Sequence, residues 1–204
     1  KNVILKLSDA LKEDTRKALA EDIELGTLLF EGDPTNAIYA VRSLGIDPST
    51  GKELYLTKDG EITETWKSSD RVFLGSYDPK YRGNISSLFQ WGGLSINLAF
   101  GYHFGGYQYN STLLSKVEIN KNMISAGNVD KRVYEDRWQK PGDVKFFKKI
   151  DDKSTKATSR FVMKESVFEL QNVSLQYTFD GPKFKEKTKM QALLIGLNMS
   201  EILY

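Results

Sequence analysis

The 204-residue sequence contains no cysteine and a single histidine, His103. Without cysteine these residues offer no disulfide, no thiolate zinc site and no thiol nucleophile. One histidine also excludes a multi-histidine metal site within them, so we expect no metal and no other cofactor. Lysine and arginine together number 29 against 27 acidic residues, and this balance gives no overall field that would attract nucleic acid.

Long hydrophobic runs are also missing, because no stretch of about 20 apolar residues occurs that could form a transmembrane helix. The interval between Arg82 and Lys116 nevertheless lacks Asp, Glu, Lys and Arg entirely. Repeated glycines disfavour a helix there. Even positions carry apolar side chains, including Leu94, Ile96, Leu98 and Phe100, and odd positions carry small or polar ones, including Ser95, Asn97 and His103.

This alternation predicts a strand over residues 94–104 with one apolar and one polar face. Its length, about 11 residues, matches a tilted membrane-spanning strand. A strand of a soluble antiparallel sandwich shows the same alternation, so the period alone leaves both interpretations open.

Three neighbouring segments show a related pattern. Apolar and polar side chains alternate along residues 84–91. Gly92-Gly93 joins this segment to the strand predicted at 94–104, which predicts a tight hairpin. Residues 168–179 alternate if a bulge lies near Gln171 and Asn172, and residues 191–199 alternate after a charged turn at 180–189.

Short turns at one end and a long polar segment at 105–165 are typical of outer-membrane barrels. Aromatic residues near the strand ends would form an interfacial girdle: Trp91, Tyr102, Phe104, Tyr177 and Phe179.

The first 80 residues differ from this pattern. Residues 7–21 predict a surface helix that Ser8 caps and that a Glu13–Lys17 pair supports. Residues 54–57 and 61–66 flank an Asp-Gly turn and predict a hairpin. Because these two strands carry charges on both faces, we expect them to lie in water.

Five segments carry a resemblance to a known family. They are residues 37–53, which we interpret as a loop, residues 75–84, the motif Asp-Arg-Trp-Gln-Lys-Pro-Gly-Asp at 136–143, residues 158–162 and residues 168–179. In order and spacing, from about residue 7 onward, the chain resembles the C-terminal part of SusC/RagA-type TonB-dependent outer-membrane transporters of Bacteroidetes.

The resemblance implies an all-β fold: C-terminal strands and extracellular loops of a large antiparallel transmembrane β-barrel of about 22 strands, incomplete in this chain. Residues 1–80 would be mainly an extracellular loop region with a short helix and a hairpin. Residues 81–204 would supply membrane strands, with a long extracellular loop at about 105–165. We expect a late fragment that lacks the plug, the TonB-contacting segment and the final strand.

The implied function is import of oligosaccharides or oligopeptides across the bacterial outer membrane. The implied partners are the remainder of the barrel, outer-membrane lipid, a SusD-like surface lipoprotein that acts as a lid, and TonB acting through the absent plug. In this interpretation Leu94, Ile96, Leu98 and Phe100 face lipid, and Ser95, Asn97 and His103 face the lumen.

The long loop offers four candidates for ligand or lid contact, Tyr107, Tyr109, Arg137 and Trp138, because aromatic faces stack on sugar rings. The alternative for each is packing within the loop, and Arg137 could pair with Asp136 or Asp143. Adjacent carboxylates such as Glu135 and Asp136 diverge on an extended chain, so we expect no enzyme. The alternative for the whole protein is a soluble, secreted, carbohydrate-binding β-sandwich.

Overall fold

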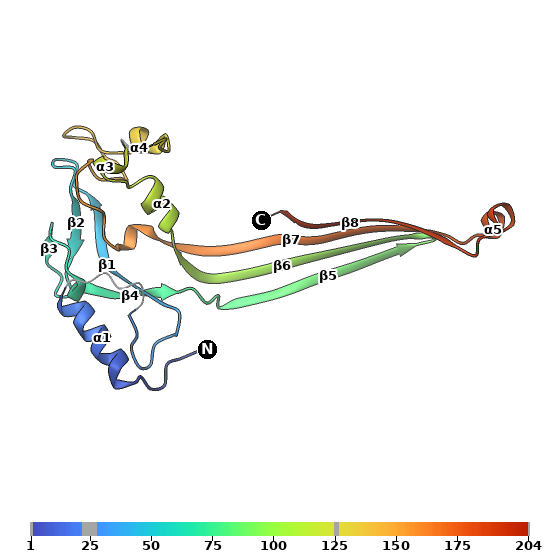
Figure 1. Ribbon diagram of the computed structural model, residues 1–204, viewed down its shortest axis with the longest axis horizontal. Helices are drawn as coiled ribbons and strands as arrows, with labels where there is room; N and C mark the ends of the chain where they lie inside the picture. Colours follow the sequence, from blue (N-terminus) through green and yellow to red (C-terminus); the bar gives the residue numbers. More distant parts are fainter. Residues whose placement is uncertain (1, 22–27, 125–126, 204) are drawn as a thin grey trace. The chain divides into compact units, whose positions relative to one another are not determined.

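The computed structural model describes residues 2–21, 28–124 and 127–203 (Figure 1). The chain is predominantly β and forms two compact units. Unit 1 combines residues 1–78 with residues 107–164, and unit 2 combines residues 79–106 with residues 165–204. The described residues form two four-stranded antiparallel sheets, and neither sheet closes on itself.

The sheet of unit 1 has the strand order β3-β2-β1-β4. The expected hairpin is confirmed, because β2 (Glu53–Leu56) pairs antiparallel with β3 (Ile62–Thr63) across a turn in which Gly60 has φ +89°. The loop interpretation of residues 37–53 was wrong over most of its length. Its first part is β1 (Ala37–Ile46), the strand that pairs with both β2 and β4 (Arg71–Ser76). Buried residues fall on both faces of β1, so its sequence shows no alternation.

A short helix precedes this sheet, as expected. Helix α1 spans Asp9–Ala20, and Ser8 caps it by accepting a hydrogen bond from the Leu11 amide. Glu13 lies 4.0 Å from Lys17, as the sequence suggested, and also 2.8 Å from Arg16. Thr15 and Ala18 form the buried side of the helix.

The segment at 107–164 contains short helices: α2 (Ser111–Lys116), α3 (Lys121–Ile124), α4 (Arg132–Glu135) and the 3-10 helix η2 (Ser159–Phe161). Outside this segment, the 3-10 helix η1 (Ser68–Asp70) precedes β4. It supplies its own apolar core: Leu113, Val117, Ile119, Val133, Phe147 and Phe161. Its last part lies along β1, where the Val41 amide donates to the Ala157 carbonyl at 3.3 Å. The Ser43 amide donates to the Ser159 hydroxyl at 2.9 Å.

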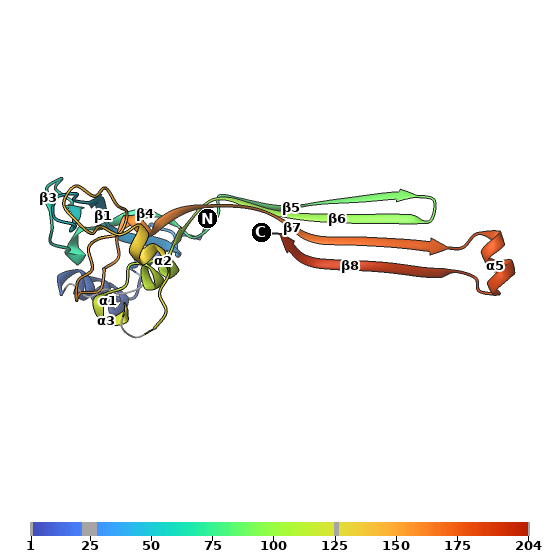
Figure 2. The ribbon, with the colours of Figure 1, turned by 90° about the horizontal axis from the view of Figure 1, so that it is seen from above.

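Unit 2 is built on four long strands in the order β5-β6-β7-β8, which lie side by side in Figures 1 and 2. They are β5 (Tyr81–Trp91), β6 (Leu94–Tyr109), β7 (Val162–Phe179) and β8 (Leu193–Leu203). The Gly92-Gly93 hairpin is confirmed, since Trp91 pairs directly with Leu94. The irregularity expected near Gln171 is confirmed by a register shift between Leu170 and Asn172.

The charged turn expected between β7 and β8 contains a helix, α5 (Pro182–Thr188). Pro182 stands in its first turn, where a missing N–H costs nothing. Lys189 ends the helix in the left-handed conformation. The chain's last residue, at position 204, lies outside the described residues.

Candidate functional site

Arg137, one of the four predicted contact residues, lies in the interior of unit 1. It is 2 % exposed, and its guanidinium donates to the carbonyls of Val117 and Ile119. The sequence allowed a pairing with Asp136 or Asp143 or a role in holding the loop, and these carbonyl contacts correspond to the second possibility. Burial lowers the pKa of Arg137 from its usual value. Its observed contacts hold the chain around residues 117–119, and a ligand contact by Arg137 stays a prediction.

Trp138 and Tyr107 each lie over a glycine. A Cβ on Gly51 would fall 2.4 Å from the Trp138 ring, and a Cβ on Gly75 would fall 2.5 Å from the Tyr107 ring. The Trp138 indole N–H also donates to the Pro48 carbonyl at 2.9 Å. Both aromatic residues are half-buried and therefore present part of their surface to solvent.

Tyr109 contributes to the apolar core of the long segment. Its ring meets Phe161 edge-on, with centroids 6.2 Å apart, and it packs against the core cluster of that segment. All four predicted contact residues thus belong to unit 1 and make packing contacts there. The structure does not gather them around one cavity.

The sequence does not reveal a buried charge network in unit 1. Arg160 binds both oxygens of Glu53 at 2.7 Å and one oxygen of Glu118 at 2.8 Å. The three side chains are 5 %, 1 % and 0 % exposed respectively. Glu53 lies one residue before the hairpin strand predicted at 54–57, and in the structure it is the first residue of β2 and is buried. Burial opposes the charge of Arg160, but the two carboxylates prevail and raise its pKa above the usual value.

A groove of about 900 Å³ lies beside this network in unit 1. One wall comes from residues around the β2–β3 hairpin, including Tyr55 and Trp66, and the other from residues 148–156. Glu53 and Thr155 also line it and are buried. Burial, followed by the charge of Glu53, raises the pKa of the Tyr55 hydroxyl, so this phenol stays protonated. Five lysines surround the groove: Lys52, Lys148, Lys149, Lys153 and Lys156.

Unit 2 has a polar surface on one face of its strands. A cleft of about 540 Å³ is lined there by ionisable and amide side chains, including Arg82, His103, Glu165, Glu169 and Gln171. The His103 ring lies 3.8 Å from the Glu165 carboxylate. A Cβ on Gly101 would fall 2.3 Å from the Gln171 amide, so glycine lets that side chain cross the neighbouring strand. The strand pairing puts Ser95 and Asn97 on the same face as His103.

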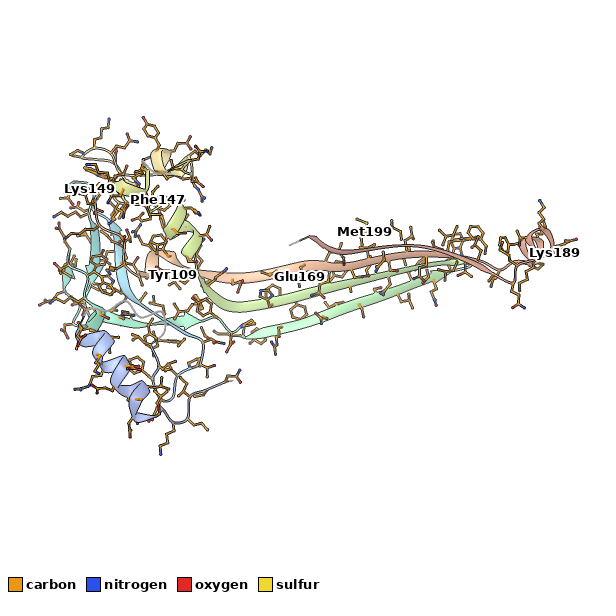
Figure 3. All side chains as sticks on the ribbon, viewed as in Figure 1. Tyr109, Phe147, Lys149, Glu169, Lys189 and Met199 are labelled. Carbon is orange, nitrogen blue, oxygen red and sulfur yellow. The ribbon has the colours of Figure 1, made fainter. Side chains whose placement is uncertain are left out.

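The opposite face of the same sheet is apolar and uncovered. The pairing of Ile85 with Phe100 and of Phe89 with Ile96 puts Leu94, Ile96, Leu98 and Phe100 on it. Phe89 is 57 % exposed, Phe168 56 % and Leu197 59 %. Figure 3 draws side chains along both faces of these strands and labels Glu169 on β7 and Met199 on β8. The predicted separation of two faces is confirmed, and which medium each face meets stays a prediction.

Comparison with known proteins gives a structural likeness only. No family model matches the sequence, and no curated protein matches it. Solved structures that match include chains of the RagAB peptide importer in its open-open state, at 22 % identity with a TM-score of 0.71, and in its closed-closed state, at 21 % identity with a TM-score of 0.71. A further structure of the RagAB peptide transporter matches at 22 % identity with a TM-score of 0.72.

These matches cover 85 to 87 % of this chain but only 19 to 20 % of the importer chains, so the chain spans about a fifth of their length. They show that the fold is related to that part of a transporter. None of the helices in the described part of the chain is long and apolar enough to cross a membrane.

Proposed function

We propose that this chain is part of a SusC/RagA-type outer-membrane importer of oligopeptides or oligosaccharides. In this proposal β5–β8 are membrane strands of a large β-barrel whose other strands lie elsewhere in the protein. Unit 1 stands outside the membrane, a SusD-like lipoprotein forms the lid, and TonB supplies energy through the plug. The related fold of the RagAB peptide importer chains supports the assignment.

The observation that carries the proposal is the uncovered apolar face of the β5–β8 sheet. Its large side chains remain 38 to 75 % exposed along β5, from Tyr81 to Trp91, and at Phe104, Phe168 and Phe179. Soluble proteins rarely leave so large an apolar surface in water. A soluble β-sandwich would bury this face under a second sheet, so the exposure argues against that alternative.

Strand length and aromatic placement give further support. Residues 81–91 span about 33 Å along the strand, which corresponds to about 25 Å of apolar height at the usual tilt of barrel strands. Trp91 and Phe179 mark one end of this height, and Tyr81, which pairs with Phe104, marks the other. Two aromatic belts about 25 Å apart are the expected girdles of a membrane barrel.

Spin labelling tests the membrane assignment directly, because this segment has no cysteine of its own. A nitroxide is attached to the variant Leu98→Cys or Asn97→Cys of the natural polypeptide in native outer membranes. The label at 98 should be relaxed mainly by oxygen, which concentrates in lipid, and the label at 97 mainly by a water-soluble nickel chelate. Leu197→Cys and Asn198→Cys on β8 form a second matched pair. Equal accessibility to both reagents at 97 and 98 would refute the proposal.

A further inference from the structure

Helix α5 and the residue that ends it carry a high density of positive charge. Four lysines occur within seven residues, at positions 183, 185, 187 and 189, and Glu186 is the one carboxylate between them. All four lysines are exposed, and no carboxylate of the described residues pairs with them. Protein surfaces ordinarily intersperse charges of both signs, so this excess indicates a negatively charged partner.

Helix α5 lies at the same end of its sheet as the hairpin turn between β5 and β6 (Figure 1). Phe179 and Leu193, which flank the helix in sequence, pair directly, and the Thr178 amide donates to the Gly93 carbonyl at 2.8 Å. The chain passes into unit 1 from the opposite ends of β5, β6 and β7. In the proposed barrel, where unit 1 stands outside, α5 therefore lies at the periplasmic surface of the membrane.

An aromatic contact holds α5 on the apolar side of the sheet. Tyr177 pairs with Ile195 and so belongs to the apolar face of β7 and β8. Its ring lies against Phe179 with centroids 4.5 Å apart, and Phe179 in turn lies 5.9 Å from Phe184 of the helix. Phe184 is half-buried, whereas the other residues of α5 are exposed. The helix is thus attached to the face that meets lipid in the proposed barrel.

The lysines of α5 are distributed around this anchor. Successive residues of an α-helix are about 100° apart, so Lys183 and Lys187 lie on one side of Phe184. Lys185 lies on its other side, and Glu186 lies about 160° away from it. Solubility alone would account for exposed lysines but not for this arrangement. An apolar anchor with lysines on both sides is typical of a segment that lies in a membrane surface, with its ammonium groups among the headgroups.

We propose that α5 binds the phosphate groups of anionic phospholipids at the periplasmic surface of the outer membrane. The inference rests on the proposed function, which puts β5–β8 in that membrane, and it adds a lipid-binding site. The four lysines provide the positive charge, and lysines close to a membrane surface attract anionic headgroups. Phe184 holds the helix at the level of these headgroups.

Brominated lipids test which lipid lies beside α5. A bimane fluorophore, which bromine quenches, is attached to the variant Met190→Cys of the natural polypeptide, and any cysteine outside this segment is replaced by serine. The protein is reconstituted in phosphatidylcholine vesicles that contain a minor share of either brominated phosphatidylglycerol, which is anionic, or brominated phosphatidylcholine, which is zwitterionic. The association constant obtained from quenching should be about fivefold higher for phosphatidylglycerol, which corresponds to about 1 kcal/mol.

Lysine variants test whether this preference comes from α5. The two lipids should bind equally to the quadruple variant Lys183→Gln, Lys185→Gln, Lys187→Gln, Lys189→Asn. Asparagine is used at position 189 because it tolerates the left-handed conformation found there. The preference should persist in the matched control, which removes the same charge from exposed lysines of unit 1: Lys58→Gln, Lys67→Gln, Lys116→Gln, Lys140→Gln.

Glu186→Gln separates charge from misfolding. It removes the carboxylate of α5 and should increase the preference for phosphatidylglycerol, which a misfolded turn would not do. Equal quenching by the two lipids in the otherwise unmodified protein would mean that the lysines serve another partner, and it would overturn the inference, as would equal effects of the two quadruple variants. Equal quenching would still put α5 at the membrane. Failure of the import proposal would instead abolish quenching by both lipids, so the two failures are distinguishable.

Discussion

The buried cation Arg160 connects parts of the sequence that lie far apart. Its partner Glu53 is 107 residues away and its partner Glu118 is 42 residues away. Neither pairing can be read from the sequence, because the partners are far apart along the chain and charged residues are mostly exposed. The sequence pattern predicted the hairpin at 54–57 and 61–66, but it did not predict that the strand begins one residue earlier, at the buried Glu53.

Replacing this cation should destabilise unit 1 strongly. Arg160→Met leaves Glu53 and Glu118 buried without a positive partner, and loss of one member of a buried ion pair costs about 3–5 kcal/mol. Native-state hydrogen exchange of the amides in β1 and β2 measures the loss. Arg16→Met is the control, because Arg16 is 77 % exposed beside Glu13 and its removal should change exchange little. Similar effects of the two variants would contradict a stabilising role for the network.

The Asp47 carboxylate gives the turn after β1 a defined pH dependence. It accepts hydrogen bonds from the Ser49 amide and from the hydroxyls of Ser49 and Thr50, at 2.8 to 2.9 Å. These bonds lower its pKa in the folded protein, the Ser49 amide most of all. A lowered folded pKa means that the stabilisation is present above the unfolded pKa of about 4 and is lost as pH falls through the folded value.

Thermal unfolding of unit 1 is followed from about pH 6 down to about pH 2.5. The midpoint temperature should fall with pH, and Asp47 should contribute to this fall. Asp47→Asn removes the ionisable carboxylate, so it should lower the midpoint temperature at high pH. The midpoint should then depend less on pH than in the unmodified protein. Asp59→Asn, in the exposed turn between β2 and β3, is the matched substitution and should leave the profile as it is in the unmodified protein. An unchanged profile for Asp47→Asn would show that the turn does not depend on the ionised carboxylate.

Among the secondary-structure elements, contacts between a glycine and an aromatic ring recur. Trp138 covers Gly51, Tyr107 covers Gly75, and Tyr102 covers Gly83, with which it pairs directly across β5 and β6. A glycine in a strand lets a neighbouring aromatic ring lie flat on the backbone. Two residues predicted to contact a ligand, Tyr107 and Trp138, have this packing role in the structure. For Tyr107 the available signal was a glycine inside a strand, but β4 was not recognised as a strand; Gly51, under Trp138, lies between β1 and β2.

Gly75→Ala tests this packing within unit 1. The added Cβ would fall 2.5 Å from the Tyr107 ring, so the ring must move, and overpacking of this kind costs about 1–3 kcal/mol. Thermal unfolding of unit 1 measures the loss. Gly127→Ala is the control, since no atom lies within 4 Å of the added Cβ there. If the double variant Gly75→Ala, Tyr107→Ala loses as much stability as the two single variants together, the ring and the glycine are not coupled.

Strands with two different faces were predictable, and strands with two similar faces were not. Strands β5 to β8 alternate between apolar and polar side chains, so their existence, the Gly92-Gly93 hairpin and the register shift near Gln171 followed from the period of two. Strand β1 is buried on both faces and α5 is rich in lysine, so neither produced a pattern that separates it from a loop or turn.

For the molecule as a whole, the decisive property is that its two sheets differ in how their apolar residues are used. Unit 1 buries Ile38, Ala40 and Val41 of β1 and has a core of its own. Unit 2 leaves large side chains exposed along one apolar face, among them Ile85, Phe89 and Leu197. Periodicity alone predicted that face but could not say what covers it, because a second sheet and lipid select the same apolar residues.

The outer strands of unit 2, β5 and β8, allow a test of the barrel proposal. β5 and β8 are the two outer strands of the sheet, so within the described part of the chain every second backbone amide of each lacks a strand partner. Lipid cannot satisfy these groups, and a membrane barrel must therefore pair both strands with further strands of the protein. Hydrogen exchange on the natural polypeptide in native membranes should show protection of all amides over residues 81–91. The isolated chain in detergent is the control and should show protection at alternate positions only. An alternating pattern in the natural polypeptide would mean that β5 has an open side there, and the barrel proposal would fail.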